Sequence, residues 1–338
     1  MKAIKKKYYL TAIVVCLIGM ILLTYSYLMG SFSSSDTTQY VYIDDDDNID
    51  SVCAKLEPFG HIMAFQTLSR HFDYPEHIKT GRYAIKPDES TITVFRHLKN
   101  GYQEPLMLTI PESRTVEKLA SALSRKLMVD SISLADSLKD AAFCKSLGFD
   151  TATIVCMMVP NTYEVYWNTS ISSLMQRMKK EHDLFWNGAR TAKAQNLGLT
   201  PNEVCTVASI IDEETANNGE KPMIAGMYLN RLKINMPLQA DPTIKFALKD
   251  FALKRIYHHM LLIDSPYNTY RHTGLPPGPI KIASVKGIDA VLNRVDHEYL
   301  YMCAKEDFSG THNFAKTYQE HLKNAAKYTK ALNERGIK

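Results

Sequence analysis

The first thirty residues, MKAIKKKYYLTAIVVCLIGMILLTYSYLMG, constrain what this chain can become more than any other stretch. Lysines come first, and an uncharged run from Tyr8 to Gly30 follows them. About 20 apolar residues in a helix rise about 30 Å, which is the thickness of the hydrocarbon core of a bilayer. The pattern therefore predicts a transmembrane helix within residues 1–30, after a short cytoplasmic stub. Because basic residues stay inside, the remainder is expected outside the cytoplasm.

A cleaved signal peptide is the alternative interpretation, because it also has a basic start and an apolar core. Two observations favour the anchor. The apolar run is longer than the roughly 7 to 15 residues of a signal core. Large residues also occupy its end (Tyr25, Tyr27, Leu28 and Met29), where a cleavage site needs small ones. We therefore expect a single-pass protein of the cytoplasmic membrane, with an extracytoplasmic or periplasmic catalytic part.

Charge and motif content exclude several classes of function. Lys and Arg number 40 against 36 Asp and Glu, and no basic block follows the N-terminal lysines, so a nucleic-acid partner is not expected. The six cysteines form no C-x-x-C, and no H-E-x-x-H occurs. The spacing of His312 and His321 does not match a zinc pair, so both are interpreted as structural. No P-loop or G-x-G-x-x-G is present, and neither a metal nor a cofactor is predicted.

A polar stretch at residues 31–40 is expected to be a flexible linker. After it, segments 42–56, 84–98 and 109–123 share the order strand, turn, helix. The first two, with a strand TGRYAI between them, form a unit that we place at residues 41–105. This unit resembles a LysM-like module, a small domain associated with glycan binding. A small α+β domain without a ligand is an equally open interpretation, because the repeat carries no site of its own.

The rest of the chain, residues 106–338, is expected to be mainly helical with long loops. Apolar residues at helical spacing predict helices at 131–147, 170–183, 201–216, 220–233 and 311–333. The helix at 201–216 has the clearest start, since Thr200 can cap it and Glu203 can complete a capping box. A long Pro- and Gly-containing stretch, Gln239–Pro279, is interpreted as functional loops. The predicted fold class is therefore α+β.

Three carboxylates in a row, Asp212, Glu213 and Glu214, end one of these helices. Glu214 lies three residues after Ile211 and seven after Val207, so it continues the buried face of the helix. Asp212 and Glu213 are rotated away from that face and are expected at its flank or in solvent. Glu214 is therefore the candidate for chemistry.

Burial, the helix dipole and two neighbouring acids all disfavour the charged form of Glu214 and raise its expected pKa. A carboxyl that stays protonated near neutral pH can serve as a general acid in glycosidic cleavage. The alternative is that the three acids form a solvated cap of the helix, because this is the usual role of acids at a helix end.

Two loop segments could complete a site around this acid. In MPLQADPTI, residues 236–244, Gln239, Asp241 and Thr243 offer polar groups for sugar hydroxyls, although an Asx-turn explains Asp241 equally well. In DSPYNTYRHTGLPPGPI, residues 264–280, the rings and polar groups could line a substrate groove. The candidate lining residues of this second segment are Tyr267, Asn268, Thr269 and Tyr270.

With these motifs in order, the chain resembles the membrane-anchored endolytic murein transglycosylases of the YceG-like family. The resemblance covers nearly the whole sequence and is carried by ASIIDEET, AGMYLNRL with MPLQADPT, SPYNTYRHTGLPPGPI and YLYMCAKEDFSGTHNFAKTYQEH. In the family motif the second acid is the one assigned to catalysis, and it falls on Glu214. The first acid falls on Asp212, where the family usually carries Glu, so the resemblance implies a supporting role there.

The resemblance implies a lyase that cleaves the MurNAc-GlcNAc bonds of nascent peptidoglycan strands internally. One acid suffices for a lytic transglycosylase, which leaves a 1,6-anhydro-MurNAc end and would terminate strand elongation. Peptidoglycan synthases are the partners that the family implies. Two alternatives stay open: a muramidase hydrolase with two carboxylates, and a glycan-binding scaffold without activity.

Overall fold

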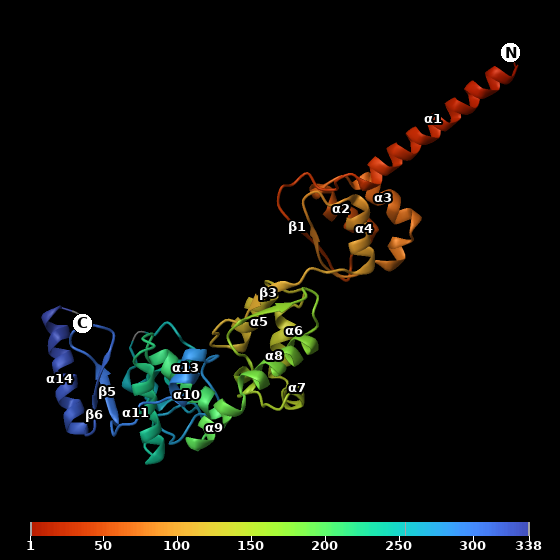
Figure 1. Ribbon diagram of the computed structural model, residues 1–338. Helices are drawn as coiled ribbons and strands as arrows, with labels where there is room; N and C mark the ends of the chain where they lie inside the picture. Colours follow the sequence, from red (N-terminus) through yellow and green to blue (C-terminus); the bar gives the residue numbers. More distant parts are fainter. Residues whose placement is uncertain (1, 254, 337–338) are drawn as a thin grey trace. The chain divides into compact units, whose positions relative to one another are not determined.

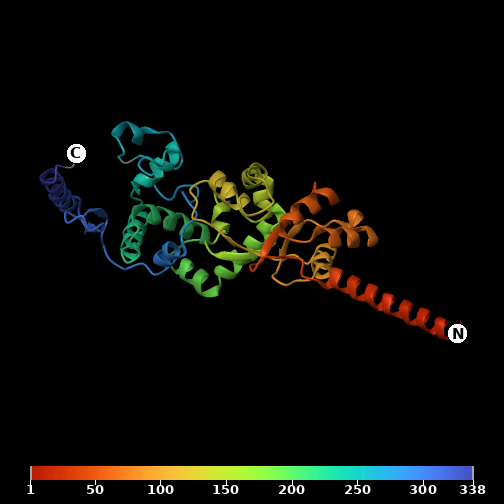
Figure 2. The same ribbon diagram turned by 90° about the horizontal axis from the view of Figure 1, so that it is seen from above.

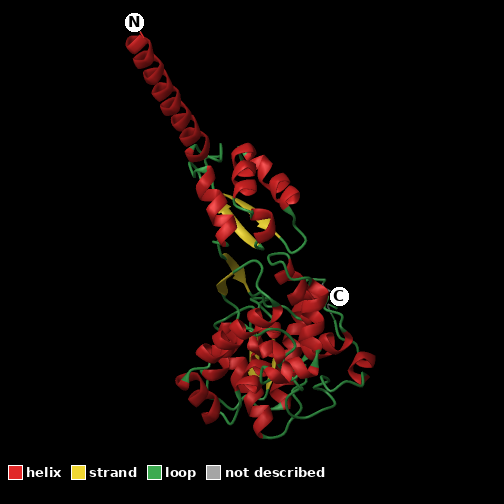
Figure 3. Ribbon diagram, turned by 90° about the vertical axis from the view of Figure 1, so that its right-hand side faces the viewer, coloured by secondary structure: helices red, strands yellow, loops and turns green. Residues whose placement is uncertain are grey.

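The computed structural model describes residues 2–253 and 255–336, and the chain divides into two compact units (Figure 1). Unit 1 extends to Met107 and adds residues 126–128 and 164–169, and unit 2 comprises the other described residues. Helices make up most of the regular structure and the strands are short (Figure 3). The predicted α+β class is confirmed.

Helix α1 (Lys2–Met29) opens unit 1 as one continuous helix (Figure 1). Its apolar part, Tyr8–Met29, has 22 residues with a mean hydropathy of 2.3 and is not buried inside the protein. A helix of this length and composition suits a membrane span, as predicted, and a signal sequence has the same properties.

The chain that follows α1 joins the core of unit 1. Phe32 is completely buried, and its backbone N–H donates to the carbonyl of Glu89 at 2.7 Å. Ser31 forms a β-bridge with Ser90, and Ser33 forms one with Gly60. The start of the segment that the sequence assigns to a linker is therefore held by backbone contacts and an apolar anchor.

The body of unit 1 is a two-stranded sheet covered by helices. Strand β1 (Gln39–Ile43) pairs antiparallel with β2 (Gly81–Ile85). The helices and 3-10 turns of the unit are α2 (Ile49–Leu56), η1 (Glu57–Phe59), α3 (Ile62–His71), η2 (Tyr74–His77) and α4 (Thr91–Asn100). The order strand, turn, helix predicted at 42–56 and 84–98 is confirmed, since β1 leads to α2 and β2 leads to α4.

Strands β3 (Leu106–Thr109) and β4 (Thr162–Val165) form a second two-stranded sheet. The helices around them in the sequence are α5 (Val116–Ser124), α6 (Ser131–Lys139), α7 (Ala141–Ser146), η3 (Ile154–Met157), α8 (Ile171–Phe185) and α9 (Gly188–Asn196). The single helix predicted at 131–147 is wrong. Asp140 has an extended backbone that ends α6, and its carboxylate accepts the N–H of Phe143 and so begins α7.

Helix α10 (Pro201–Glu214) is the centre of unit 2. Thr200 and Glu203 form the predicted capping box, and eight consecutive residues, 204–211, are buried. The helix packs against α11 (Lys221–Lys233), α12 (Asp241–Leu248) and α13 (Val285–Leu292). Helix α12 and the 3-10 turn η4 (His258–Leu262) lie inside the stretch that the sequence assigned to loops, so that assignment holds only for the rest of it.

The C-terminal part of unit 2 is a β-hairpin with a helix against it, shown in blue in Figure 2. Strand β5 (Tyr301–Ala304) pairs antiparallel with β6 (His312–Ala315), and α14 (Tyr318–Glu334) packs on both. The helix predicted at 311–333 is therefore wrong over its first residues. Thr317 caps α14, so the helix begins only after the strand has paired with β5.

Candidate active site

A cavity of about 220 Å³ lies beside the C-terminal turn of α10, and we call it the Glu214 cavity. Its walls come from α10, α11, the start of α12, the loop after η4 and the β5–β6 hairpin. The residues that line it are Glu214, Met227, Tyr228, Arg231, Leu238, Gln239, Asp241, Tyr270, Met302, Cys303, Ala304 and His312. Segments far apart in the sequence thus meet around one carboxyl group.

Glu214 is partly buried, and the Oη of Tyr228 donates to its Oε1 at 2.7 Å. Burial is the largest influence on this carboxyl and raises its pKa. The hydrogen bond from Tyr228 opposes that effect, the charge of Asp241 reinforces it, and the charges of His312 and Arg231 oppose it. The net result is a raised pKa. Such a group can hold a proton and give it up within the cavity.

Arg231 and Tyr228 form a rigid wall of the Glu214 cavity, since both are less than a tenth exposed. The guanidinium donates to three backbone carbonyls, Nε to Leu300 at 2.6 Å and Nη1 to Leu238 at 2.7 Å and to Pro237 at 3.4 Å. Carbonyls satisfy its hydrogen bonds without neutralising its charge. The positive charge therefore remains available to a polar ligand in the cavity.

Three of the seven predicted lining residues meet in this cavity: Gln239, Asp241 and Tyr270. Tyr270 donates its Oη to Oδ1 of Asp241 at 2.5 Å. Gln239 has a left-handed backbone, with φ of 48°, and its N–H donates to the carbonyl of Thr269 at 3.0 Å. The two loop segments are thus joined by hydrogen bonds, and a second carboxylate lies in the same cavity as Glu214.

The other four predicted residues lie elsewhere. Thr243, Asn268 and Thr269 are buried, and they bond within the protein instead of lining the Glu214 cavity. Thr243 donates to the carbonyl of Ala240 at 2.7 Å, and Thr269 accepts the N–H of Ala240 at 3.0 Å. Asn268 donates to two backbone carbonyls, at 2.8 and 2.9 Å. Tyr267 lines a different cavity.

Of the two positions expected for Asp212 and Glu213, the flank of the helix or solvent, the solvent position is wrong. The Asp212 side chain is 2% exposed, and its carboxylate pairs with Lys221 Nζ at 2.7 Å and accepts the N–H of Ser284 at 2.7 Å. Glu213 is 15% exposed and accepts a bidentate bond from Arg114, with its shortest distance 2.8 Å. Helix α13 and the loop before α5 cover these acids. The three carboxylates therefore face three different environments.

A family model described as the YceG-like family matches residues 41–327. That match spans most of the chain. The chain belongs to the YceG-like family. The resemblance indicated by the four motifs is thereby confirmed.

Relatives of this YceG-like chain carry the name endolytic murein transglycosylase. One from Streptococcus pneumoniae is 27% identical over 345 residues, which cover 90% of this chain and 61% of the relative. One from Bacillus subtilis is 28% identical over 322 residues, covering 89% of this chain and 88% of the relative. The chain thus spans about three fifths of the length of the pneumococcal relative.

Among solved structures, this YceG-like chain is similar to a YceG-like protein of Listeria monocytogenes. The identity is 26% and the TM-score 0.56, over 86% of this chain and 99% of the other.

Sequence reasoning missed several lining residues of this YceG-like site, among them Tyr228, Arg231 and, on strand β6, His312. His312 was interpreted as a structural histidine, and its Nδ1 does lie 2.9 Å from the buried carboxylate of Glu220, which also accepts its backbone N–H. The ring nevertheless lines the Glu214 cavity. Among the described residues, no group of three or more His, Cys, Asp or Glu side chains is placed to hold a metal ion.

Proposed function

We propose that this chain is an endolytic peptidoglycan lytic transglycosylase, a lyase in which Glu214 is the catalytic acid and then the base. The names of its relatives support this activity. One observation carries the assignment to Glu214: a carboxyl with a raised pKa lines a polar cavity and is oriented by a hydrogen bond to one of its two oxygens. That bond leaves Oε2 for a substrate.

The reaction needs no water and no second acid. The Glu214 carboxyl gives its proton to the oxygen between MurNAc C1 and GlcNAc, the bond from C1 to that oxygen breaks, and positive charge develops at C1. The Glu214 carboxylate then takes the proton of the 6-hydroxyl of the same MurNAc, and O6 bonds to C1. The products are a GlcNAc 4-hydroxyl and a 1,6-anhydro-MurNAc end. Tyr228 fixes the orientation of the carboxyl through both steps.

A muramidase hydrolase is the second candidate, because Asp241 lines the same cavity and could activate a water as a second carboxylate. The hydrogen bond from Tyr270 already occupies one oxygen of Asp241. The masses of the products separate the two reactions, since an anhydro end weighs one water less than a reducing end.

We further infer how the chain is placed in the cell envelope. Helix α1, exposed and apolar over 22 residues, would anchor it once in the cytoplasmic membrane with the remainder outside. Residues 31–40 would lead to a LysM-like region at 41–105 that binds or positions glycan, and residues 106–338 would form the catalytic domain. The partners would be glycan strands, whose elongation the cleavage ends, and peptidoglycan synthases.

The test uses the full chain in detergent with isolated glycan strands. Replacing Glu214 with Gln should lower the cleavage rate by roughly 10²- to 10⁴-fold, the usual contribution of general acid-base catalysis. Glu213→Gln is the matched control, because it changes the adjacent acid, which does not line the Glu214 cavity, and it should keep most of the activity.

Cleavage by Glu214→Gln at the wild-type rate would show that another group is the acid. A loss of activity in Asp241→Asn, together with reducing ends in the products, would favour the hydrolase. Strand binding without any cleavage by the unaltered chain would leave the scaffold alternative.

A further inference from the structure

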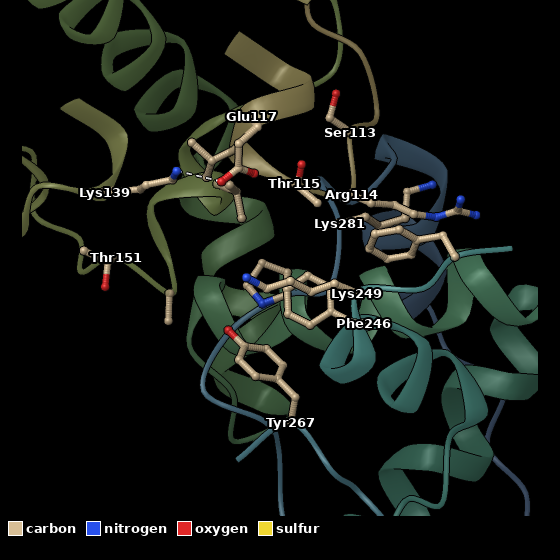
Figure 4. A pocket seen from close by; sticks show the side chains of 15 residues that line it. Ser113, Arg114, Thr115, Glu117, Lys139, Thr151, Phe246, Lys249, Tyr267 and Lys281 are labelled. Carbon is tan, nitrogen blue, oxygen red and sulfur yellow. Dashed lines mark ion pairs between the residues drawn. The ribbon is translucent and has the colours of Figure 1, made fainter. Parts of the chain in front are cut away.

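Unit 2 contains a second cavity, of about 290 Å³, which shares no lining residue with the Glu214 cavity (Figure 4). We call it the basic cavity. The lining residues that matter here are Arg114, Lys139, Lys249, Lys281, Phe246 and Tyr267. No step of the proposed reaction uses any of them.

The lining of the basic cavity is dominated by cations. Its lining includes one acidic residue, Glu117, and four basic ones, Arg114, Lys139, Lys249 and Lys281. The Glu117 carboxylate is engaged by Lys139 at 2.7 Å, the ion pair drawn in Figure 4. Arg114 is paired with Glu213, and Lys281 with Glu112 at 2.9 Å. The charge that remains is that of Lys249, and it favours an anionic ligand.

Lys249 is the most available of these cations. It follows α12 with a left-handed backbone, and its N–H bonds to two carbonyls of that helix. Its side chain is exposed, and within residues 2–253 and 255–336 no carboxylate pairs with it. An ammonium group positioned at a cavity and left without a partner can bind a carboxylate from outside the protein.

The walls below these charges are apolar. The rings of Phe246 and Tyr267 lie 4.7 Å apart between centroids, and Val116, Val155 and Pro279 add further apolar surface. A small inorganic anion would leave this surface in contact with water. A ligand with both a carboxylate and small apolar groups would cover it.

The basic cavity is also connected to the turn that carries Glu214. Arg114 bonds Glu213 at 2.8 Å, and the Nζ of Lys281 lies 3.7 Å from the same carboxylate. Glu213 directly precedes Glu214 in α10. A ligand carboxylate that bound Arg114 would compete with Glu213, the residue next to Glu214.

From these contacts we propose that the basic cavity binds the peptide branches of peptidoglycan, which are short peptides with small apolar side chains and free carboxylates. The glycan of the same strand would occupy the Glu214 cavity. This inference rests on the proposed function for the identity of the ligand, whereas the recognition of an apolar carboxylate rests on the basic cavity alone.

The direct test measures binding of a synthetic alanyl-γ-glutamyl peptide to the full chain in detergent by calorimetry. The free acid should bind, and its amide should bind about fivefold more weakly, as expected for the loss of one solvent-exposed charge pair. Lys249→Gln should weaken binding of the acid by a similar factor and Lys249→Glu by more. Lys180→Gln, at an exposed lysine on α8, is the matched control and should leave binding unchanged.

Equal affinity of the unaltered chain and Lys249→Glu for the peptide would overturn the proposal. Displacement of the peptide by inorganic phosphate at equal concentration would overturn it too, because the cavity would then recognise charge without the apolar part.

A second measurement compares cleavage of strands with and without their peptides. Lys249→Glu should raise KM only for strands that carry peptides. If cleavage depended on Glu214 but the chain bound no peptide, the proposal of peptide binding in the basic cavity would be refuted and the proposed function would stand. If the chain bound the peptide through Lys249 but cleaved no strands, peptide binding by the basic cavity would stand and the proposed function would be refuted.

Discussion

Two carboxylates lie two residues apart on α10, and their surroundings are opposite. Asp212 is bonded to a buried lysine at the start of α11 and to the backbone and hydroxyl of Ser284, the N-cap of α13. Glu214 is bonded to a neutral tyrosine and borders an open cavity. A carboxylate whose charge is fully compensated holds helices together, whereas one without a cation in contact keeps its proton chemistry available.

Among the variants that test this comparison, Asp212→Asn is expected to have the largest effect, a loss of stability. This change leaves the buried Lys221 without its counter-charge, and breaking a buried ion pair in this way costs about 3 to 5 kcal/mol. The free energy of unfolding, measured with urea on the full chain in detergent, should fall by that amount. Strand cleavage at a temperature where the variant is folded should persist.

The double variant Asp212→Asn with Lys221→Met is the control, because it removes both charges. It should recover much of the lost stability. A variant Asp212→Asn that folds as stably as the unaltered chain but loses cleavage as Glu214→Gln does would make Asp212 part of the chemistry, and the comparison would fail.

Tyr228→Phe tests the surroundings of Glu214 and has the next largest expected effect. A hydrogen bond to a charged group contributes roughly 1.5 to 3 kcal/mol, so kcat/KM should fall by about 10- to 100-fold. Because the bond from Tyr228 lowers the pKa of Glu214, its removal raises that pKa further. The pH at which activity declines on the alkaline side should therefore move upward. A lower rate with an unmoved pH profile would mean that Tyr228 acts only through packing.

Gly287→Ala probes how closely α13 approaches Asp212. A Cβ at Gly287 would lie 2.5 Å from the Oδ1 of Asp212, so the carboxylate or the helix must shift. Overpacking of this kind costs roughly 1 to 3 kcal/mol. Denaturant unfolding should show this loss of stability. Gly148→Ala cannot serve as a control, because Gly148 has a φ of 85°, which strains any other residue. Gly188→Ala, at a position with open space, should leave stability nearly unchanged.

The smallest expected effect is the pH dependence of stability that Glu214 contributes. Its pKa is raised in the folded state, so its contribution to stability is fully present below the unfolded pKa and is lost as the pH rises through the folded pKa. Glu214→Gln does not titrate. Its Tm relative to the unaltered chain should therefore increase with pH over that interval. A Tm difference that is the same at acidic and alkaline pH would contradict the raised pKa.

How far the sequence predicts this site differs between these two carboxylates. Helical spacing from Val207 and Ile211 places Glu214 on the inner face, because that argument needs only the geometry of one helix. The environment of Asp212 could not be predicted in the same way. Its partner Ser284 lies 72 residues further along, on a helix whose approach to α10 no local pattern encodes.

The loop residues show the same limit. Thr243, Asn268 and Thr269 are polar groups in turn-rich segments, and such groups either meet a ligand or satisfy backbone atoms of the turns themselves. The sequence does not distinguish these uses, and here the second holds within the folded chain. The capping box at Thr200 was predictable because its partners are three residues apart.

The attachment of α1 to the core of its own unit has a mechanical consequence. Phe32, three residues after α1 ends, is inserted in the core of unit 1, and the flanking serines are bridged on both sides. These contacts fix the backbone directly after the helix to the rest of the unit. A change in the tilt of α1 would therefore act directly on the backbone around Phe32, at the edge of the apolar core of unit 1.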